Sequence, residues 1–391
     1  MAVNILQKPD EPVLARKRQR WTVQTISFTR LEQYRVEMVF EQEDDLPDVV
    51  ISQIPNSVNV SYFEPSEIID ALLSHKLPIV RVDTDNDSYR LISAKIREVW
   101  FVSNEERENI TDISFYALKA GVGHNLQQLD FNSYFSNKML AFTGNGMKVT
   151  KESWQYVSFL WVAQSDAVFR VEGIVYYDDG SSRRYTAYYS ELSPGNPFSN
   201  FILSARNALK VIDCSYASLG LANYDVSGKT IVQFGIEVRV GAFRTEPYLF
   251  TLVDKPVRQS FLFANSAGGW SVLHCFGNFE EESSFDYKNT EVNVPLNNLP
   301  GSIQFKNFDA SERQAFTIST GFLKKGGKGM QHAKEFLKSR YRYVINESGD
   351  FVPIVLQNAT YKTDQSQPGL LAIQFAYQYA FANQLYDSFD L

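Results

Sequence analysis

Two segments of this chain alternate between large apolar residues and small or polar ones, and this pattern constrains the fold most. In residues 232–240, valine, phenylalanine and isoleucine occupy every second position. In residues 371–381, leucine, isoleucine and aromatic residues alternate with alanine and glutamine. Successive side chains of a strand point to opposite faces of a sheet, so both segments are predicted to be β-strands.

Other local signals agree with a mainly β protein. Residues 171–177 and 183–189 flank Asp179-Gly180, a pair that favours a tight hairpin turn through positive φ angles. Aromatic residues make up 14% of the chain, and they favour strands. Only residues 66–75, with Ser66 as the expected N-cap, and residues 329–339 have helical spacing. The predicted fold is mainly β, with several β-sandwich-like units and a few short helices.

A chain of 391 residues usually contains more than one domain. We predict a β-rich N-terminal domain with one helix (1–147), a β-sandwich-like middle domain (148–256) and a β-rich C-terminal domain with one helix (257–391). Within the last domain, Phe261–Gly277 is predicted to form two strands around a glycine turn. Trp270 is expected to pack into the core of that domain.

The sequence gives no sign of export or of membrane insertion. Pro9 and Pro12 interrupt the region where a signal peptide would lie, and no run of about 18 apolar residues occurs. We therefore expect synthesis in the cytoplasm and no insertion into a membrane. Cys214 and Cys275 are expected to be buried free thiols, although the sequence does not show whether they lie near each other.

Two motifs resemble ligand sites but fail in detail. Asp83, Asp85 and Asp87 resemble a calcium loop without its glycine and glutamate, so a polar hairpin loop is expected, with adventitious cation binding as the alternative. Lys324–Gly329 lacks the spacing of a phosphate loop and is expected to be a basic loop before a helix. Glu280–Glu282 is expected in a solvated turn. We expect no cofactor, no metal site and no enzyme activity, and we assign no catalytic residue.

The densest positive cluster consists of Arg16, Lys17, Arg18 and Arg20. Nucleic-acid binding would require such charge to be spread over one face with aromatic stacking platforms. It is not expected here, because the chain has a net charge of -7 and the cluster directly precedes an expected strand that begins at Trp21. The alternative interpretation is an interface arm that pairs with an acidic patch on a neighbour, such as residues 41–45.

Several stretches together are similar to one known family. They are Met1–Pro9, Lys148–Tyr189 with its Tyr-Tyr-Asp-Asp-Gly-Ser hairpin, Phe261–Gly277, and the set Phe336–Ser339, Phe351–Ile354 and Phe375–Ala380. The chain resembles virion structural proteins of the tail and baseplate encoded by phages and prophages of Bacteroidota. The family often has arginine where Ala264 stands and aspartate where Ser271 stands.

This resemblance implies a structural role in the virion tail. Several copies would assemble at the tail end and link the tail tube to the host-recognition apparatus. The partners would be copies of the chain and other tail or baseplate proteins, with host glycans or receptors reached through neighbouring proteins. Two alternatives remain open: a receptor- or glycan-binding tail protein that stacks exposed Tyr and Trp on sugar rings, and a tail-associated glycan hydrolase.

The last predicted strand supplies the candidate interface. One of its faces carries no charge, which is unusual for a surface in water, so a neighbouring layer or subunit is expected to cover it. The strand could also offer an unpaired edge to another chain. The interface residues on this face are Ala372, Gln374, Ala376, Gln378 and Ala380.

Overall fold

The computed structural model describes most of the chain. The described residues are 3–9, 11–25, 32–41, 47–79, 82–121, 138–141, 143, 145–161, 169–189, 208–240, 243–291, 305–363 and 369–381. They form two compact units that share the chain in alternating segments. Unit 1 consists of residues 1–142, 155–249 and 265–271, and unit 2 of residues 143–154, 250–264 and 272–391. The domain boundaries predicted near residues 147 and 256 concern independent folding, and they stay a prediction.

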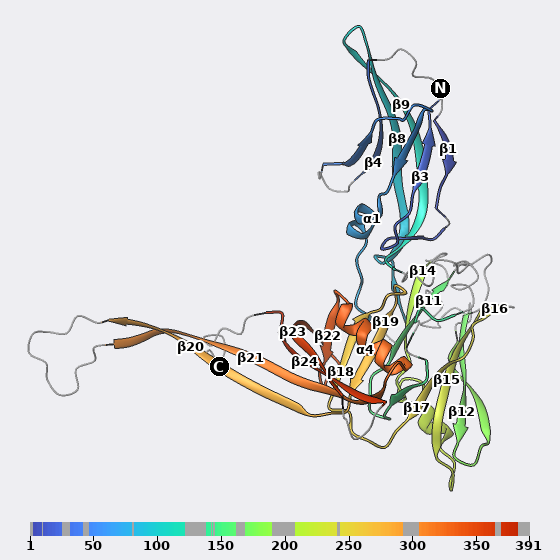
Figure 1. Cartoon of the computed structure of the whole chain (residues 1–391). Coiled ribbons are helices and arrows are strands. Elements are labelled where there is room, and N and C mark those ends of the chain that lie inside the picture. Colours follow the sequence, from blue (N-terminus) through green and yellow to red (C-terminus); the bar gives the residue numbers. More distant parts are fainter. Residues whose placement is uncertain are drawn as a thin grey trace, which may run out of the picture. The chain divides into compact units, whose positions relative to one another are not determined.

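Strands dominate the described residues, which confirms the mainly β fold with several sheets and few short helices (Figure 1). The helical elements are α1 (Ser66–Leu72), the 3-10 turn η2 (Leu221–Tyr224) and α4 (Lys328–Lys338). The strands are β1 (Asn4–Gln7), β2 (Val13–Leu14), β3 (Trp21–Gln24), β4 (Glu32–Phe40), β5 (Val49–Gln53), β6 (Val60–Phe63), β7 (Val82–Asp85), β8 (Tyr89–Val102), β9 (Glu105–Leu118), β10 (Met147–Val149), β11 (Tyr156–Trp161), β12 (Phe169–Tyr177), β13 (Ser182–Tyr189), β14 (Ala208–Asp213), β15 (Ile231–Val240), β16 (Phe243–Arg244), β17 (Tyr248–Leu252), β18 (Gln259–Ala264), β19 (Trp270–Cys275), β20 (Phe279–Glu291), β21 (Phe305–Lys324), β22 (Arg342–Ile345), β23 (Phe351–Thr363) and β24 (Leu370–Tyr379).

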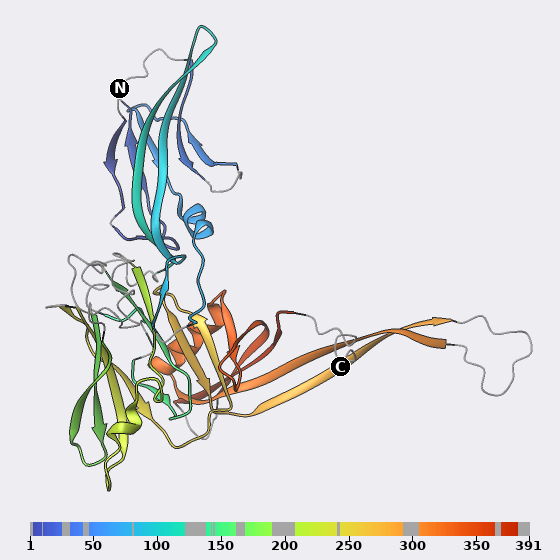
Figure 2. The same ribbon diagram turned by 180° about the vertical axis from the view of Figure 1, so that it is seen from behind.

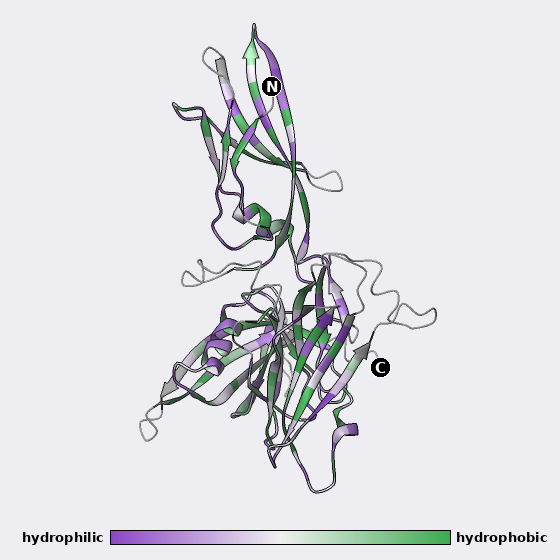
Figure 3. Ribbon diagram, turned by 90° about the vertical axis from the view of Figure 1, so that its right-hand side faces the viewer, coloured by the Kyte–Doolittle hydropathy of each residue, from purple (hydrophilic) through white to green (hydrophobic). Residues whose placement is uncertain are grey.

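The N-terminal part of unit 1 contains two antiparallel-rich sheets with a common core. One sheet has the order β1-β3-β6 and the other β2-β9-β8-β4-β5. Alternate residues of these strands are apolar, and the bands can be followed along the ribbon in Figure 3. The core contains Trp21, whose ring centroid lies 5.2 Å from that of Phe115. Burial of alternate residues is what fixes the strand register here.

Helix α1 is short and depends on neighbouring side chains at both ends. Ser66 is not the N-cap: its hydroxyl donates to the Lys17 carbonyl at 2.9 Å and accepts from the Gln19 N–H. At the C-terminal end, the Lys119 ammonium donates to the Leu73 carbonyl, and Arg90 donates to the Leu72 carbonyl at 2.7 Å. Cations at the last carbonyls of a helix stabilise it. The N-cap prediction was wrong because the serine hydroxyl forms tertiary hydrogen bonds instead.

The predicted hairpin is confirmed as β12 and β13, which pair antiparallel. Its turn differs in one detail, because among Asp178, Asp179 and Gly180 only the glycine has a positive φ, of 80°. The Gly180 N–H donates to the Tyr177 carbonyl at 3.1 Å. This is the geometry of a three-residue loop closed by a left-handed glycine. The predicted strand over 232–240 is also confirmed as β15, which pairs with β12.

Unit 2 is built on a sheet of order β19-β18-β22-β23-β24-β21-β20, with α4 packed on one face. The Phe336 ring of α4 has its centroid 5.2 Å from that of Phe261 and 5.1 Å from that of Phe375. The Phe261 centroid also lies 5.2 Å from that of Tyr377, in an edge-to-face arrangement. Aromatic packing of this kind is the core of the unit. The two predicted helices and the strand over 371–381 are therefore confirmed.

Strands β18 and β19 with the turn Asn265–Gly269 confirm the predicted pair of strands around glycines. Trp270 is buried, but its predicted place in the core of 257–391 was wrong. Its indole N–H donates to the Lys76 carbonyl at 2.9 Å, and its ring centroid lies 5.5 Å from that of His75. The turn belongs to unit 1. The neighbours of Trp270 were predicted wrongly because they were inferred from its position close to β18 in the sequence.

Two loop predictions also need correction. Asp83 and Asp85 lie on β7, and Asp87 lies in the turn after it, where Asp85 accepts from the backbone N–H of Ser88 at 2.9 Å. The segment is not a β7–β8 hairpin loop, because β7 pairs with β14 rather than with β8. Glu280–Glu282 lies on strand β20 rather than in a turn. Lys324–Gly329 is a loop that leads into α4, as predicted.

The burial of Trp270 gives a stability prediction. Trp270→Ala removes a fully buried indole and its hydrogen bond, so the free energy of unfolding should fall by about 3–5 kcal/mol. Urea denaturation followed by circular dichroism measures this. Phe381→Ala is the control, because Phe381 is 52% exposed. This substitution should lower the free energy of unfolding by much less than Trp270→Ala does. Equal midpoints for the Trp270 variant and the wild type would contradict the packing.

Candidate functional site

The outer face of β24 carries the predicted interface residues. Ala372, Gln374 and Gln378 are half-buried within the chain, Ala376 is 8% exposed, and Ala380 is exposed just beyond the strand. The opposite face holds the buried row Leu371, Ile373, Phe375 and Tyr377. The structure therefore brings the predicted residues together on one face.

Uncharged residues of the neighbouring strands extend this face, which is bordered by Glu280 of β20 and Lys362 of β23, the residues paired with Thr317 and Ala372. Thr317 and Ser319 of β21 pair with Ala376 and Gln374, and Thr360 of β23 also pairs with Gln374. Side chains of directly paired residues lie on the same face of a sheet. The Gln357 amide of β23 donates to the Gln378 side-chain oxygen at 2.8 Å. We call this set, centred on Gln374 and Gln378, the outer face of unit 2.

The expectation that β24 offers a free edge was wrong. Over Leu370–Tyr379 the strand pairs with β21 on one side and with β23 on the other. It lies inside the sheet because the chain's last described strand inserts between two strands that precede it. The two edge strands of the sheet are instead β19 and β20.

Strands β20 and β21 form a long two-stranded ribbon that sequence reasoning missed. From Glu282–Ala315 to Glu291–Phe305 the two strands pair with each other, whereas β24 begins to pair with β21 only at Phe316. Figures 1 and 2 show this ribbon continuing past the end of β24. About ten residue pairs at roughly 3.4 Å each give a ribbon of about 34 Å.

The described β20 side chains of this ribbon are exposed, whereas Gln314 and Ala315 of β21 are half-buried. Every described residue from Phe279 to Lys288 on β20 is exposed, including Phe285 at 47% and Tyr287 at 57%. The two rings stack on one face, with centroids 6.4 Å apart. A hairpin that packs on no other layer is marginally stable in water, so a covering surface on a partner would stabilise it. The signal in the sequence was the Phe285–Tyr287 alternation beside an acidic run.

The basic cluster is largely neutralised within the chain. The Arg16 guanidinium lies 2.9 Å from Asp70, and Glu64 pairs with Arg18 at 2.7 Å and with Arg20 at 3.1 Å. Hydrogen bonds from these two arginines lower the pKa of Glu64. Lys17 lies beside Arg16 in this cluster and its backbone is used by Ser66. Of the suggested acidic partner, Glu41 pairs with Lys95, and residues 42–46 lie outside the described residues. The interface role of the cluster stays a prediction.

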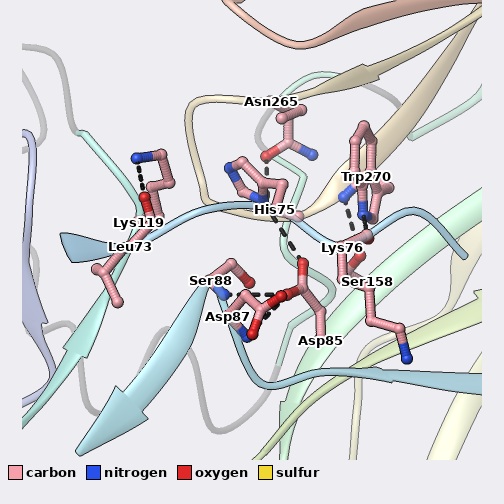
Figure 4. A network of polar contacts seen from close by, with 12 residues as sticks. Leu73, His75, Lys76, Asp85, Asp87, Ser88, Lys119, Ser158, Asn265 and Trp270 are labelled. Carbon is pink, nitrogen blue, oxygen red and sulfur yellow. Dashed lines mark hydrogen bonds and ion pairs between the residues drawn. The ribbon is translucent and has the colours of Figure 1, made fainter. Parts of the chain in front are cut away.

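A buried polar network in unit 1 surrounds the Asn265–Trp270 turn (Figure 4). The His75 Nδ1 atom lies 3.6 Å from a carboxylate oxygen of Asp85. The Asn265 amide donates to the Leu140 carbonyl at 2.7 Å, and the Trp270 backbone N–H donates to the Ser158 hydroxyl at 2.9 Å. Sequence reasoning missed this network because its members are distant along the chain.

The network contains residue types used in hydrolases, but its accessibility argues for a structural role. The side chain of His75 is 0% exposed and that of Asp85 is 1% exposed. Burial lowers the pKa of His75, against the opposing effect of Asp85, so the imidazole is neutral at pH 7. The ring is therefore not in contact with solvent. The pair fixes the turn after β7 to the segment after α1.

Each of the two cysteines is buried. Cys214 and Cys275 are buried free thiols, as predicted, and burial raises the pKa of both. Across the described residues, no group of three His, Cys, Asp or Glu side chains is placed to hold a metal ion. Asp83 accepts from the backbone N–H of Ile79 at 2.9 Å, so it is engaged in local structure. Among the described helices, none is long and apolar enough to cross a membrane.

Comparisons with known proteins give little additional information. No family model and no curated protein matches the sequence. Among solved structures, one matching chain belongs to the tail of an empty GTA particle, computed with helical refinement in C6 symmetry. The match covers 32% of this chain and 94% of that chain, with 13% identity and a TM-score of 0.21. A likeness at this score supports no argument, and the Bacteroidota origin stays a hypothesis.

Burial of histidine predicts acid sensitivity of unit 2. Burial, with the charge of His332 acting in the same direction, lowers the pKa of His274 from 6.5 to about 3. Below pH 6.5 the unfolded chain gains a proton that the folded chain does not, so stability is full above that pH and falls by about 1.4 kcal/mol per pH unit towards pH 3.

His274→Asn removes this titration and keeps an amide beside Ser260, whose hydroxyl lies 2.8 Å from the His274 Nδ1 atom. Between pH 6.5 and about pH 5, the variant should lose about 2 kcal/mol less stability than the wild type. Urea titrations at each pH measure the difference. Parallel stability curves for the two proteins would contradict it.

Proposed function

We propose that this chain is a structural subunit of a phage tail or baseplate, present in several copies at the tail end, where it joins the tail tube to the host-recognition apparatus. The observation that carries the proposal is the β20–β21 ribbon, whose described β20 residues are exposed on both faces. Such an element is stabilised when a partner covers it. Phe261–Gly277 and the other matching stretches resemble tail and baseplate proteins, and this resemblance indicates the kind of assembly that the chain would join.

The outer face of unit 2 supports the same proposal. Surfaces that stay in water usually contain charged residues. Ala376 and the flanking glutamines, threonines and serine carry no charge. Interface cores are depleted in charged residues and enriched in aromatic residues. The ribbon aromatics and the outer face together fit a protein that contacts neighbours through two surfaces.

A non-catalytic role is part of the proposal. The His75 ring is not in contact with solvent, and His274 is held neutral by burial. The proposed partners are copies of this chain and other tail proteins, with host glycans reached through them. The virion tail is the proposed location. A purified chain that binds a glycan array, or that releases reducing sugar, would favour the two alternative functions instead.

The outer face gives the first test. Gln374→Lys with Gln378→Lys places two charges on half-buried positions and should prevent incorporation into particles. Ala376 is left unchanged, because at 8% exposure a lysine there would disturb the fold of the chain itself. The measurement is complementation of a phage or prophage lacking the gene, with particles counted by electron microscopy.

The matched control for this test changes Ile54 and Val58 to lysine, since these residues are 80% and 64% exposed in unit 1. Both variants should unfold at the wild-type urea concentration. Normal particles from the Gln374→Lys, Gln378→Lys variant would refute the outer face as an interface. Normal particles without the gene would refute the proposed function.

The ribbon gives a second test. Phe285→Ser with Tyr287→Ser removes two exposed rings, so the free energy of unfolding should change by less than about 1 kcal/mol. Incorporation into particles should fall at least tenfold, because aromatic side chains supply much of the energy of interface cores. Quantitative immunoblots of purified particles measure this. Full incorporation would show that the ribbon faces solvent in the particle.

A further inference from the structure

Unit 2 contains a pocket that neither the outer face nor the ribbon uses. Its volume is about 550 Å³, within the usual range of ligand sites. Apolar side chains line much of it, including Leu273, Phe276, Leu323 and Leu370. Thr320 and Gly321, at the irregular stretch of β21, and Gly329 of α4 also line it.

Three lysines from different segments surround this pocket. Lys148 comes from β10, Lys255 from the segment after β17, and Lys324 from the end of β21. All three are exposed, and in the described part of the chain none of them forms an ion pair. Asp254 is the acidic residue of the lining, so the rim has a net positive charge. An apolar pocket with a cationic rim suits an occupant that is both apolar and acidic.

The chain itself contains such a segment. Residues 382–391, which lie outside the described residues, read Ala-Asn-Gln-Leu-Tyr-Asp-Ser-Phe-Asp-Leu. Four large apolar side chains, Leu385, Tyr386, Phe389 and Leu391, are interspersed with Asp387 and Asp390, and the segment has no basic residue. Its apolar residues match the pocket lining, and its two carboxylates match the lysines.

The length of the segment indicates which copy supplies it. Leu370 lines the pocket at the start of β24, whereas the tail leaves the sheet after Tyr379. Nine steps along a strand separate these ends by about 30 Å. The eight residues from Ala380 to Asp387 span at most about 29 Å when fully extended. A chain's own tail must therefore be almost fully extended for Asp387 to reach the lysines, whereas the tail of another copy is under no such constraint.

We infer that the pocket bounded by Lys148, Lys255 and Lys324 binds residues 382–391 of a second copy of this chain. The apolar residues of the tail enter the pocket, and Asp387 and Asp390 pair with the lysines at its rim. This contact goes beyond the proposed function, because it joins copies of the chain whatever larger particle they build. Its electrostatic part weakens as salt is raised.

The test uses the full chain and a synthetic fluorescent peptide with the sequence of residues 382–391. Peptide anisotropy is titrated at chain concentrations where the protein sediments as a monomer. The peptide should bind the wild type, and Lys148→Glu, Lys255→Glu, Lys324→Glu together should raise the Kd at least tenfold. A peptide with Asp387→Asn and Asp390→Asn should bind the wild type at least tenfold more weakly than the unmodified peptide.

The control protein changes Lys8, Lys151 and Lys338 to glutamate, which alters the net charge equally at positions outside the pocket. It should bind the peptide with the wild-type Kd, and circular dichroism should show both triple variants folded. Absence of peptide binding to the wild type would overturn the inference. So would an equal Kd for the wild type and the pocket variant, or an equal loss in the control. These outcomes do not bear on the proposed role in a phage tail, because the assay contains no particle.

Discussion

The aromatic row on the inner face of β24 is the constraint on which most of unit 2 depends. Phe375 and Tyr377 both pack on Phe261, and Phe375 also packs on Phe336 of α4. Because side chains alternate along a strand, burial of this row forces the alanines and glutamines between them onto the other face. A slip of one residue would expose the rings and bury the amides. The core and the uncharged outer face are thus consequences of one register.

The place of β24 inside the sheet also accounts for the distribution of charge. An interior strand makes both of its ladders within the chain, so it needs no charge to prevent pairing with other proteins. The edge strand β20 does need such protection, and it carries Glu280–Glu282 and Lys288. Charged edges oppose non-specific backbone pairing. A partner is therefore expected to contact the ribbon through Phe285 and Tyr287 rather than by adding a strand.

Local patterns predicted local structure well and long-range neighbours poorly. The strands over 232–240 and 371–381, the hairpin at Asp179-Gly180 and the helix near Phe336 follow from periodicity and turn chemistry, which act between near neighbours. Pairing of β7 with β14 joins residues more than a hundred positions apart, and no local pattern encodes it. The same reason explains Trp270, whose burial was predicted from its type but whose contacts were not. The outer face was predicted, whereas the ribbon was missed.

The loop from Asn265 to Ser271 shows how polar contacts tie distant segments together. It leaves β18 and re-enters β19 in unit 2, yet its own contacts are with Leu140, Ser158 and Lys76 of unit 1. Directed hydrogen bonds to buried groups are costly to break, because each leaves an unsatisfied donor or acceptor. Gly269 is needed at the tightest point, since a Cβ there would lie 2.7 Å from Ser158 and 2.8 Å from the Leu140 carbonyl oxygen. A cut before residue 257 would therefore separate Trp270 from its hydrogen-bond partners, so the segments that build unit 1 fold as one system although they are not consecutive in the chain.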